Sequence, residues 1–339
     1  MPHRFSKFGF ATLALICWAG AAMANPDEWR RGEWPRTDFS VHSVDYGEIN
    51  SGGPPKDGIP AIDDPRFESL KDGQAEGWAD GLADTEPVLS LALGDDARAY
   101  PLRVLIWHEI VNDTVGGEPV AVTYCPLCNA ALVFERTVNG RVLDFGATGK
   151  LRHSDLVMYD RQTESWWQQF TGEAIVGAMT GSELKLIPSR LESFARFRER
   201  FPQGRVLVPS DPALRDYGAN PYLGYDAEGA TPFLYTGEMP SGIEPMARVV
   251  AIEAAPDRHE AWSLALLRER GEIRAGDLVL RWAAGQSSAL DARTVASGRD
   301  VGNVIVQRKE GDRLVDVPHD VTFAFAFHAF RPHSPIHTR

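Results

Sequence analysis

The chain has 339 residues, of which 43% are hydrophobic and 24% are charged, and its formal net charge is −12 at pH 7. A chain of this length and composition can bury a large core, which excludes an intrinsically disordered protein. The acidic excess argues against binding of nucleic acid, because phosphate backbones attract basic surfaces.

The first 24 residues have the three parts of a secretory signal peptide. Arg4 and Lys7 precede an apolar run over residues 8–22, and a small-residue cleavage pattern ends at Ala24. We expect cleavage near Ala24 and a mature protein that is soluble, has no membrane span, and is periplasmic or secreted. Cys17 lies inside the apolar run and is expected to leave with the signal.

Composition divides the rest of the chain into four parts. Residues 25–85 are rich in Pro, Gly and Asp and predict an irregular N-terminal segment. Regular patterns over residues 86–210 predict a β-rich module that carries both remaining cysteines. Residues 211–245 predict a long connecting loop, and residues 246–332 predict a second β-rich module without thiols.

The first module is predicted to consist mainly of strands. Strand-like runs cover residues 88–93, 120–124 and 131–136. Asn139-Gly140 is a strong signal for a two-residue hairpin turn, which leads into residues 141–145.

Two helices are predicted within this module. The first follows Pro101, has apolar residues at helical spacing up to Ile110, and stops at Gly116-Gly117. The second spans Ser189 to Arg200, with Ser189 as its N-terminal cap.

The second module repeats the order of patterns found in the first. Aligning Tyr124 with Trp282 sets Ala283 opposite Cys125, so the second copy keeps the scaffold without the thiols. The tail over residues 323–330 alternates large and small side chains and predicts a half-buried strand. We therefore expect an α+β, β-rich fold of two related mixed β modules, an internal pseudo-repeat, with short helices.

Three blocks of sequence resemble a known bacterial family. They are Trp107-His-Glu-Ile-Val-Asn-Asp, Thr123-Tyr-Cys-Pro-Leu-Cys-Asn and the run over residues 154–174. With the similarity extending over residues 85–332, the chain resembles the family catalogued as domain of unknown function 3179. The resemblance implies no established activity. Some members of that family carry selenocysteine in the cysteine motif, which implies redox chemistry or soft-metal binding rather than a purely structural pair.

Cys125 and Cys128 are the two cysteines of the expected mature chain, and they lie three positions apart between predicted strands. The first hypothesis is thiol–disulfide redox chemistry, with one cysteine as the attacking thiolate and the other as the resolving group. Since no helix N-terminus is predicted at the motif, a cation has to lower the thiol pKa, and His108 is the candidate. Cys125, Cys128 and His108 are then the catalytic residues, and the partner is a periplasmic thiol-redox protein.

The second hypothesis is a copper (or zinc) binding protein that holds its metal with Cys125, Cys128 and His108. Two sulfurs and one imidazole suit either ion, and soft sulfur ligands favour Cu(I). Met158, His153 or solvent is expected at the fourth position. The expected partner is then a metal-delivery protein.

The third hypothesis is a non-catalytic binding module in which the two cysteines form a structural disulfide. A disulfide that closes a loop of about four residues removes only about 2 kcal/mol of unfolded-chain entropy, so it stabilises the folded state weakly. The binding surface would be Trp166 and Trp167, whose rings can stack on a ligand. Five residues are predicted as walls of the site: Tyr124, Asn129, Tyr159, Trp166 and Trp167.

Overall fold

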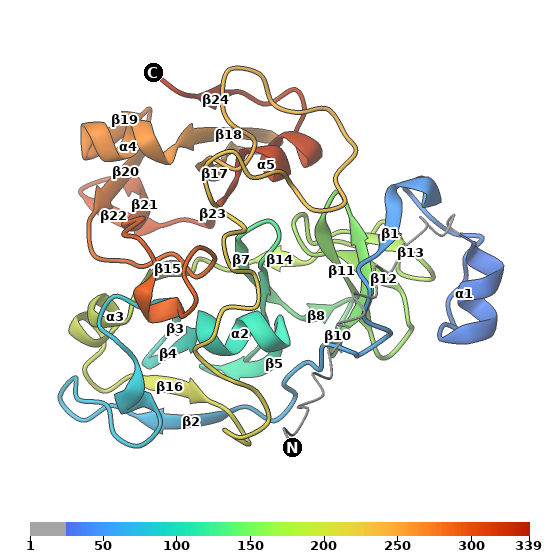
Figure 1. Ribbon diagram of the computed structural model, residues 1–339, viewed down its shortest axis with the longest axis horizontal. Coiled ribbons are helices and arrows are strands. Elements are labelled where there is room, and N and C mark those ends of the chain that lie inside the picture. The colour runs from blue at the N-terminus through green and yellow to red at the C-terminus, as the bar shows by residue number, and fades with distance from the viewer. Residues whose placement is uncertain (1–24) are drawn as a thin grey trace, which may run out of the picture.

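A computed structural model describes residues 25–339 (Figure 1). The predicted signal peptide and Cys17 lie outside the described residues. Within that range the protein is β-rich and has five α-helices of seven residues each, as expected of an α+β fold. None of these helices is long and apolar enough to cross a membrane. The helices are α1 (Pro26–Gly32), α2 (Leu102–His108), α3 (Phe194–Arg200), α4 (Leu264–Arg270) and α5 (Ala324–Phe330).

Three sheets and one small hairpin are built from residues before 210. The sheets have the strand orders β15-β3-β4-β16-β2, β14-β7-β6-β5 and β1-β10-β11-β12-β13, and the hairpin is β8-β9. The strands are β1 (Ile49–Ser51), β2 (Arg66–Ser69), β3 (Pro87–Leu93), β4 (Asp96–Pro101), β5 (Ile110–Val115), β6 (Glu118–Cys125), β7 (Ala130–Glu135), β8 (Thr137–Val138), β9 (Arg141–Val142), β10 (Phe145–Arg152), β11 (Asp155–Asp160), β12 (Trp166–Gln168), β13 (Ala174–Val176), β14 (Lys185–Leu186), β15 (Arg190–Ser193) and β16 (Arg205–Val208).

Two four-stranded sheets form the second half of the chain, and they lie together in the upper left of Figure 1. Their strand orders are β23-β17-β18-β24 and β19-β20-β21-β22. The strands are β17 (Arg248–Ala255), β18 (Arg258–Ser263), β19 (Glu272–Ala275), β20 (Leu278–Ala283), β21 (Asn303–Glu310), β22 (Arg313–Asp316), β23 (His319–Phe323) and β24 (Ile336–His337).

The two halves contain the same succession of elements. The hairpin β3-β4 leads into α2 and the meander β5-β6-β7, while the hairpin β17-β18 leads into α4 and the meander β19-β20-β21. Each hairpin gains an antiparallel strand followed by a helix, β15 and α3 in one half and β23 and α5 in the other. Each also gains one parallel strand, β16 or β24. β6 ends at Cys125 and β20 ends at Ala283, the two positions that the sequence alignment sets opposite each other.

Most strands predicted in the first module are confirmed. The runs over residues 88–93, 120–124 and 131–136 lie within or nearly within β3, β6 and β7. Asn139 and Gly140 form the predicted turn with φ angles of 51° and 75°, the left-handed values that such a hairpin turn requires. The strand expected over residues 141–145 is interrupted, because β9 ends at Val142 and β10 begins at Phe145.

Both helices predicted in the first module begin or end elsewhere. α2 ends at His108 because Glu109 has a φ of 59°, which a right-handed helix cannot contain, and Ile110 already belongs to β5. Gly116-Gly117 forms the turn between β5 and β6. The helix expected from Ser189 begins only at Phe194, because the residues before it pair with β3 as strand β15.

The strand predicted over residues 323–330 is wrong. Phe323 ends β23, and the remaining residues form α5. Phe325 and Phe327 are both nearly inaccessible to solvent, so this helix is apolar on more than one face, as a helix inside a protein is. Over so short a stretch, alternation of large and small apolar residues does not distinguish a strand from such a helix.

The largest apolar core contains residues from both halves of the chain. β23 of the second half lies against β7 of the first, and β15 of the first half lies against β21 of the second. The two halves therefore pack directly against each other. Residues 211–245 carry no helix or strand in the described structure and run over the face seen in Figure 1. The segment over residues 25–85 supplies the edge strands β1 and β2.

Candidate functional site

Cys125 and Cys128 lie in the tight connection between β6 and β7. Cys125 is the last residue of β6 and pairs with Ala130, the first residue of β7. Asn129 completes the turn with a φ of 53°, a left-handed value that asparagine tolerates well. Both cysteines are free thiols, and their exposed fractions are 1% and 0%. The prediction that the motif lies between two strands is confirmed.

Strand β23 of the second half holds this turn from outside. The carbonyl of Cys128 accepts hydrogen bonds from the backbone N–H of Phe323 at 3.0 Å and from Oγ1 of Thr322 at 2.7 Å. Asn129 donates from its side-chain amide to the carbonyl of Val321 at 2.5 Å, and Tyr124 donates to Asn129. The position of the thiols therefore depends on both halves of the chain.

Asp155, the first residue of β11, joins the two thiols. One carboxylate oxygen of Asp155 and the two Sγ atoms all lie within 4.8 Å of one another. Oδ2 accepts hydrogen bonds from the side-chain amide of Gln168 at 2.6 Å and from the backbone N–H of Phe170 at 2.9 Å. Oδ1 is buried and has no hydrogen-bond partner within residues 25–339. This arrangement orients the carboxylate and leaves one oxygen unpaired.

Burial dominates the protonation of this group. Burial raises the pKa of the Cys125 thiol, and it raises that of Cys128 well above the ordinary value. Burial also raises the pKa of Asp155 to about 6, although its contacts with Gln168, with Phe170 and with the two thiols act in the opposite direction. Without a cation, the three groups hold their protons more tightly than they do in water.

Glu109 lies at the edge of the same region. Its backbone, at the end of α2, accepts a hydrogen bond from the N–H of Tyr124 at 2.8 Å, beside Cys125. Burial, together with the charge of Asp155, raises the pKa of Glu109 to about 8. Glu109 lines a pocket of about 320 Å³ whose other walls include Leu127 of the cysteine turn and Tyr222 of the connecting loop.

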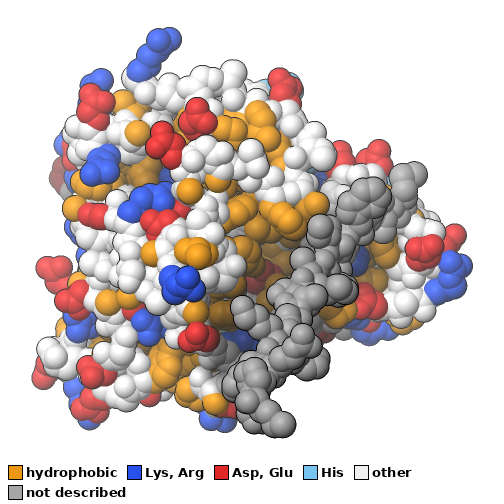
Figure 2. Space-filling model, viewed as in Figure 1, with side chains coloured by type: hydrophobic (Ala, Val, Ile, Leu, Met, Phe, Trp, Pro, Cys, Tyr) orange, Lys and Arg blue, Asp and Glu red, His pale blue; other side chains and the backbone are white. Residues whose placement is uncertain are grey.

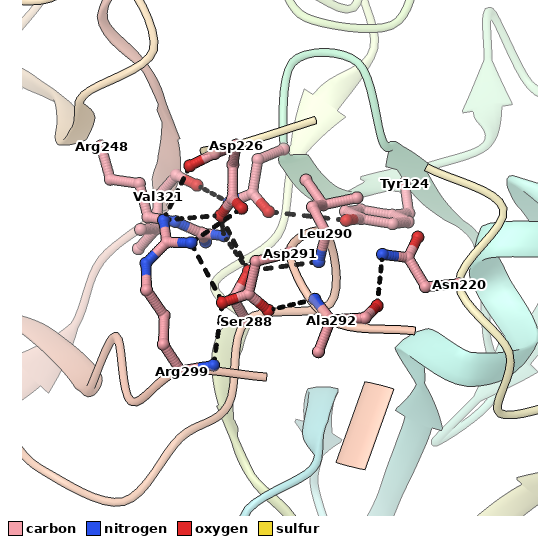
Figure 3. A network of polar contacts seen from close by, with 11 residues as sticks. Tyr124, Asn220, Asp226, Arg248, Ser288, Leu290, Asp291, Ala292, Arg299 and Val321 are labelled. Carbon is pink, nitrogen blue, oxygen red and sulfur yellow. Dashed lines mark hydrogen bonds and ion pairs between the residues drawn. The ribbon is translucent and has the colours of Figure 1, made fainter. Parts of the chain in front are cut away.

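An ion-pair network fixes the connecting loop at Asp226 (Figure 3), next to Tyr225, which lines this pocket. Asp226, whose side chain is fully buried, accepts hydrogen bonds from Arg248 and Ser288, each at 2.8 Å, and pairs with Arg299 at 2.9 Å. Burial by itself would raise the pKa of Asp226, but the two guanidinium groups hold it below its usual value. The backbone N–H of Tyr225 is also bonded to the carbonyl of Leu290.

His108 is not brought to the thiols. Its Nδ1 lies 2.8 Å from the carbonyl oxygen of Pro60, and its Nε2 lies 2.7 Å from the hydroxyl of Tyr217. Burial lowers the pKa of His108, so the ring is not the cation that the redox hypothesis requires. Both ring nitrogens are engaged, and the group of potential metal ligands contains Asp155 in place of this histidine.

The remaining residues predicted for the site are divided between two places. Tyr124 and Asn129 lie beside the thiols, as described above. Tyr159 and Trp166 belong to a separate apolar cluster with Trp34, and Trp167 donates its indole N–H to Asp160 at 3.0 Å. Trp166 and Trp167 are fully buried and offer no open surface for stacking.

The two side chains expected as alternatives to solvent at the fourth metal position also differ in location. Met158 is fully buried on β11, the strand that Asp155 begins. His153 lies 3.6 Å from Glu48, a contact on the side of the N-terminal segment. No local pattern in the sequence marks Asp155 as part of the site. In the structure it begins β11 directly after His153 and Ser154, which both have positive φ angles and form a tight turn.

These features define a β-rich α+β protein with a buried centre of two thiols and one carboxylate. The chain belongs to the family described as "Protein of unknown function (DUF3179)", which matches residues 56–334 and confirms the resemblance seen in the sequence. No curated protein and no solved structure matches the chain.

Proposed function

We propose that this protein binds a metal ion with Cys125, Cys128 and Asp155. The observation that carries the proposal is the unpaired, buried Oδ1 of Asp155 beside two thiols. A buried carboxylate oxygen without a partner is costly, and a cation that binds there removes the cost. The ion would also compensate the charge of two thiolates, because metal binding deprotonates cysteine.

Zinc fits these ligands better than copper. Zn²⁺ binds both thiolate and carboxylate groups, whereas Cu(I) prefers soft sulfur ligands. Three protein ligands leave a fourth tetrahedral position, which is characteristic of catalytic rather than structural zinc sites. The side-chain amide of Gln168 and the N–H of Phe170 would orient the carboxylate from behind, as outer contacts do in metal sites.

Thiol–disulfide exchange is the second candidate, and the observation that favours it is the closeness of two free thiols. Burial argues against it, because a partner protein needs access to the attacking sulfur and a fraction of thiolate at neutral pH. Cys125 is 1% exposed, and burial raises its thiol pKa. Redox chemistry at this site would therefore need a small oxidant or an opening of the connecting loop.

The test is metal analysis of the purified protein, followed by titration of the metal-free protein with Zn²⁺, Cu(I) and Co²⁺. We expect one equivalent of zinc, two thiolate-to-cobalt charge-transfer contributions in the cobalt form, and a loss of affinity of at least about 10-fold in Asp155→Asn. His108→Ala is the matched control and should leave the affinity unchanged. No stoichiometric ion, together with a disulfide that cycles reversibly, would reject the metal proposal in favour of redox chemistry.

We also infer that the chain is exported and meets its metal outside the cytoplasm. The support is the composition of residues 1–24, and the expected partner is a metal-delivery protein of the same compartment. Mass spectrometry of the protein isolated from its cells tests the inference, because cleavage after Ala24 leaves a chain that begins at Asn25. An intact N-terminus on cytoplasmic protein would reject it.

We further propose that the two halves are an internal repeat in which one copy carries the ligands. The matching order of β3 to β7 and β17 to β21 supports this, as do the corresponding ends of β6 and β20. Superposition of the two halves in a crystal structure tests it. The expected result is that Ala283 falls on Cys125, and a different arrangement of the hairpins and helices would rule out a repeat.

A further inference from the structure

The pocket beside the cysteine turn has mainly apolar walls that come from distant parts of the chain. Ile59 belongs to the N-terminal segment, Leu127 to the cysteine turn, Leu156 to β11, and Tyr222 and Phe233 to the connecting loop. Figure 2 shows a hollow near the middle of this face, with hydrophobic side chains around it. The pocket volume of about 320 Å³ lies at the lower end of the range for ligand pockets.

Glu109 is held in the wall of this pocket by a strained backbone. Its φ and ψ angles are 59° and −32°, a combination that residues with a side chain rarely adopt. This conformation ends α2 directly before β5, and the carbonyl of Glu109 accepts a hydrogen bond from the N–H of Tyr124. Strained positions persist where the surrounding structure imposes them, and they are concentrated at functional sites. The strain therefore points to a role for the Glu109 side chain.

The side chains of Glu109 and Tyr222 bring two polar groups to these walls. Glu109 is only 7% exposed, yet among residues 25–339 nothing is hydrogen bonded to its carboxyl or to the Tyr222 hydroxyl. Burial raises the pKa of Tyr222, and a charge on Glu109 raises it further, so the two groups lie near each other. Buried polar groups are normally hydrogen bonded, which leaves both of these free to bond a ligand.

Both groups are hydrogen-bond donors at neutral pH. Burial raises the pKa of Glu109 to about 8, so this carboxyl keeps its proton, as the Tyr222 hydroxyl also does. A carboxylic acid that stays protonated in an apolar site can donate a hydrogen bond without carrying a charge. One carbonyl oxygen has two lone pairs and can accept a hydrogen bond from each donor.

We propose that the pocket binds an uncharged, largely apolar molecule through a carbonyl oxygen, which accepts hydrogen bonds from Glu109 and Tyr222. The apolar part of the ligand packs against Ile59, Leu127 and Phe233. A charged ligand fits these walls less well, because it loses its hydration there. The inference goes beyond metal binding and does not require it.

The size of the pocket suits a ligand with one ring. An apolar cavity of about 150 Å³ holds a benzene molecule, so about 320 Å³ accommodates a ring with a short side chain. Tyr222 and Tyr225 contribute flat surfaces of the kind against which rings pack. Acetophenone, an aromatic ring with one ketone group, is therefore a suitable probe.

The test compares three probes of one skeleton by calorimetry on the purified full chain, with and without zinc. The probes are acetophenone, ethylbenzene, which has no hydrogen-bond acceptor, and α-methylbenzylamine, which carries an ammonium group in place of the ketone. We expect acetophenone to bind at least about 5-fold more tightly than either, the gain expected of two hydrogen bonds between neutral groups.

Three variants assign this preference to the two donors. Glu109→Met should remove the advantage of acetophenone over ethylbenzene, because the thioether cannot donate a hydrogen bond. Tyr222→Phe should reduce the same advantage. Glu109→Gln should keep most of it, because the amide N–H still donates, and this result separates loss of a donor from a general disturbance of the pocket.

Tyr217→Phe is the matched control for Tyr222→Phe. Tyr217 belongs to the same connecting loop, but its hydroxyl contacts His108 and it does not line the pocket. This variant should leave all three affinities unchanged. Equal affinity for the three probes, tightest binding of α-methylbenzylamine, or no binding of acetophenone overturns the inference even if zinc binds. Preference for acetophenone in a protein that takes up no metal supports the inference and rejects the metal proposal alone.

Discussion

The carbonyl oxygen of Cys128 accepts a hydrogen bond from Oγ1 of Thr322 at 2.7 Å, although 194 positions separate the two residues. The neighbouring backbone N–H of Phe323 donates to the same oxygen. These bonds join the thiol-bearing turn of the first half to β23 of the second half. The geometry of the centre formed by Cys125, Cys128 and Asp155 therefore depends on both halves of the chain being folded.

Thr322→Val should loosen this turn without removing a ligand. We expect a loss of about 1 kcal/mol in the free energy of unfolding, because one buried hydrogen bond is lost while Phe323 still donates. Zinc affinity should fall several-fold. Urea unfolding and zinc titration measure the two effects. Thr114→Val, at an exposed position of β5, is the control, and equal behaviour of the two variants would show that Thr322 does not support the turn.

Asp226→Asn should destabilise the protein strongly. It removes the charge that balances Arg248, whose side chain is 6% exposed, and breaking a buried pair in this way costs about 3 to 5 kcal/mol. Arg299→Gln should cost less than about 1 kcal/mol, because that side chain is half exposed. Chemical unfolding compares them. Similar losses in both variants would mean that the network does not anchor the connecting loop through Arg248.

Asp320 should make the metal-free protein less stable as the pH rises. Burial raises its pKa to about 8 from 3.8, so the folded state binds a proton that the unfolded state releases above about pH 4. Its contribution is complete below pH 4 and is lost up to about pH 8, with a slope of at most about 1.4 kcal/mol per pH unit. Asp155 and Glu109 act in the same direction.

Asp320→Asn should reduce this slope, because an amide does not ionise and its oxygen can still accept the backbone N–H of Ala131. The measurement is the urea midpoint between pH 5 and pH 9. Asp312→Asn, at an exposed position, is the control. An unchanged slope in Asp320→Asn would mean that this carboxyl ionises normally in the folded protein.

Gly149→Ala should displace the N-terminal segment from β10. A Cβ atom at Gly149 would lie 2.0 Å from the carbonyl oxygen of Pro54, and the φ of 72° strains any other residue. Gly94→Ala isolates the strain, because its φ is 59° and a Cβ there meets nothing within 4 Å. We expect about 1 kcal/mol lost in Gly94→Ala and clearly more in Gly149→Ala. Urea unfolding measures both losses, and equal losses in the two variants would contradict the clash.

Local patterns were sufficient where short-range chemistry decides the structure. The Asn139-Gly140 turn was predictable because only residues that tolerate positive φ form it. The strands that flank the cysteines were predictable from their β-branched and apolar runs. The end of α2 at His108 was not, because Glu109 adopts a backbone conformation that glutamate seldom takes and that its surroundings impose.

The composition of the candidate centre shows the same limit. His108 was a reasonable ligand from its residue type and its closeness to the cysteines in the chain, yet its two nitrogens contact Pro60 and Tyr217. Asp155 replaces it because the packing of two separate sheets against each other brings the start of β11 close to the end of β6. The alternation over residues 323–330 misled for a related reason, since burial on several faces permits helix and strand alike.

By itself, the sequence determined the family, the β-rich class, the strands on either side of the cysteines and the importance of Cys125 and Cys128. These follow from local propensity and from the presence of two thiols in a fixed, short spacing. Only the tertiary structure decided that Asp155 completes the centre, that His108 lies outside it, and that Glu109 lines a pocket beside the cysteine turn. Such groupings depend on pairing between strands and loops far apart in the chain, and no local pattern records which distant side chains will meet.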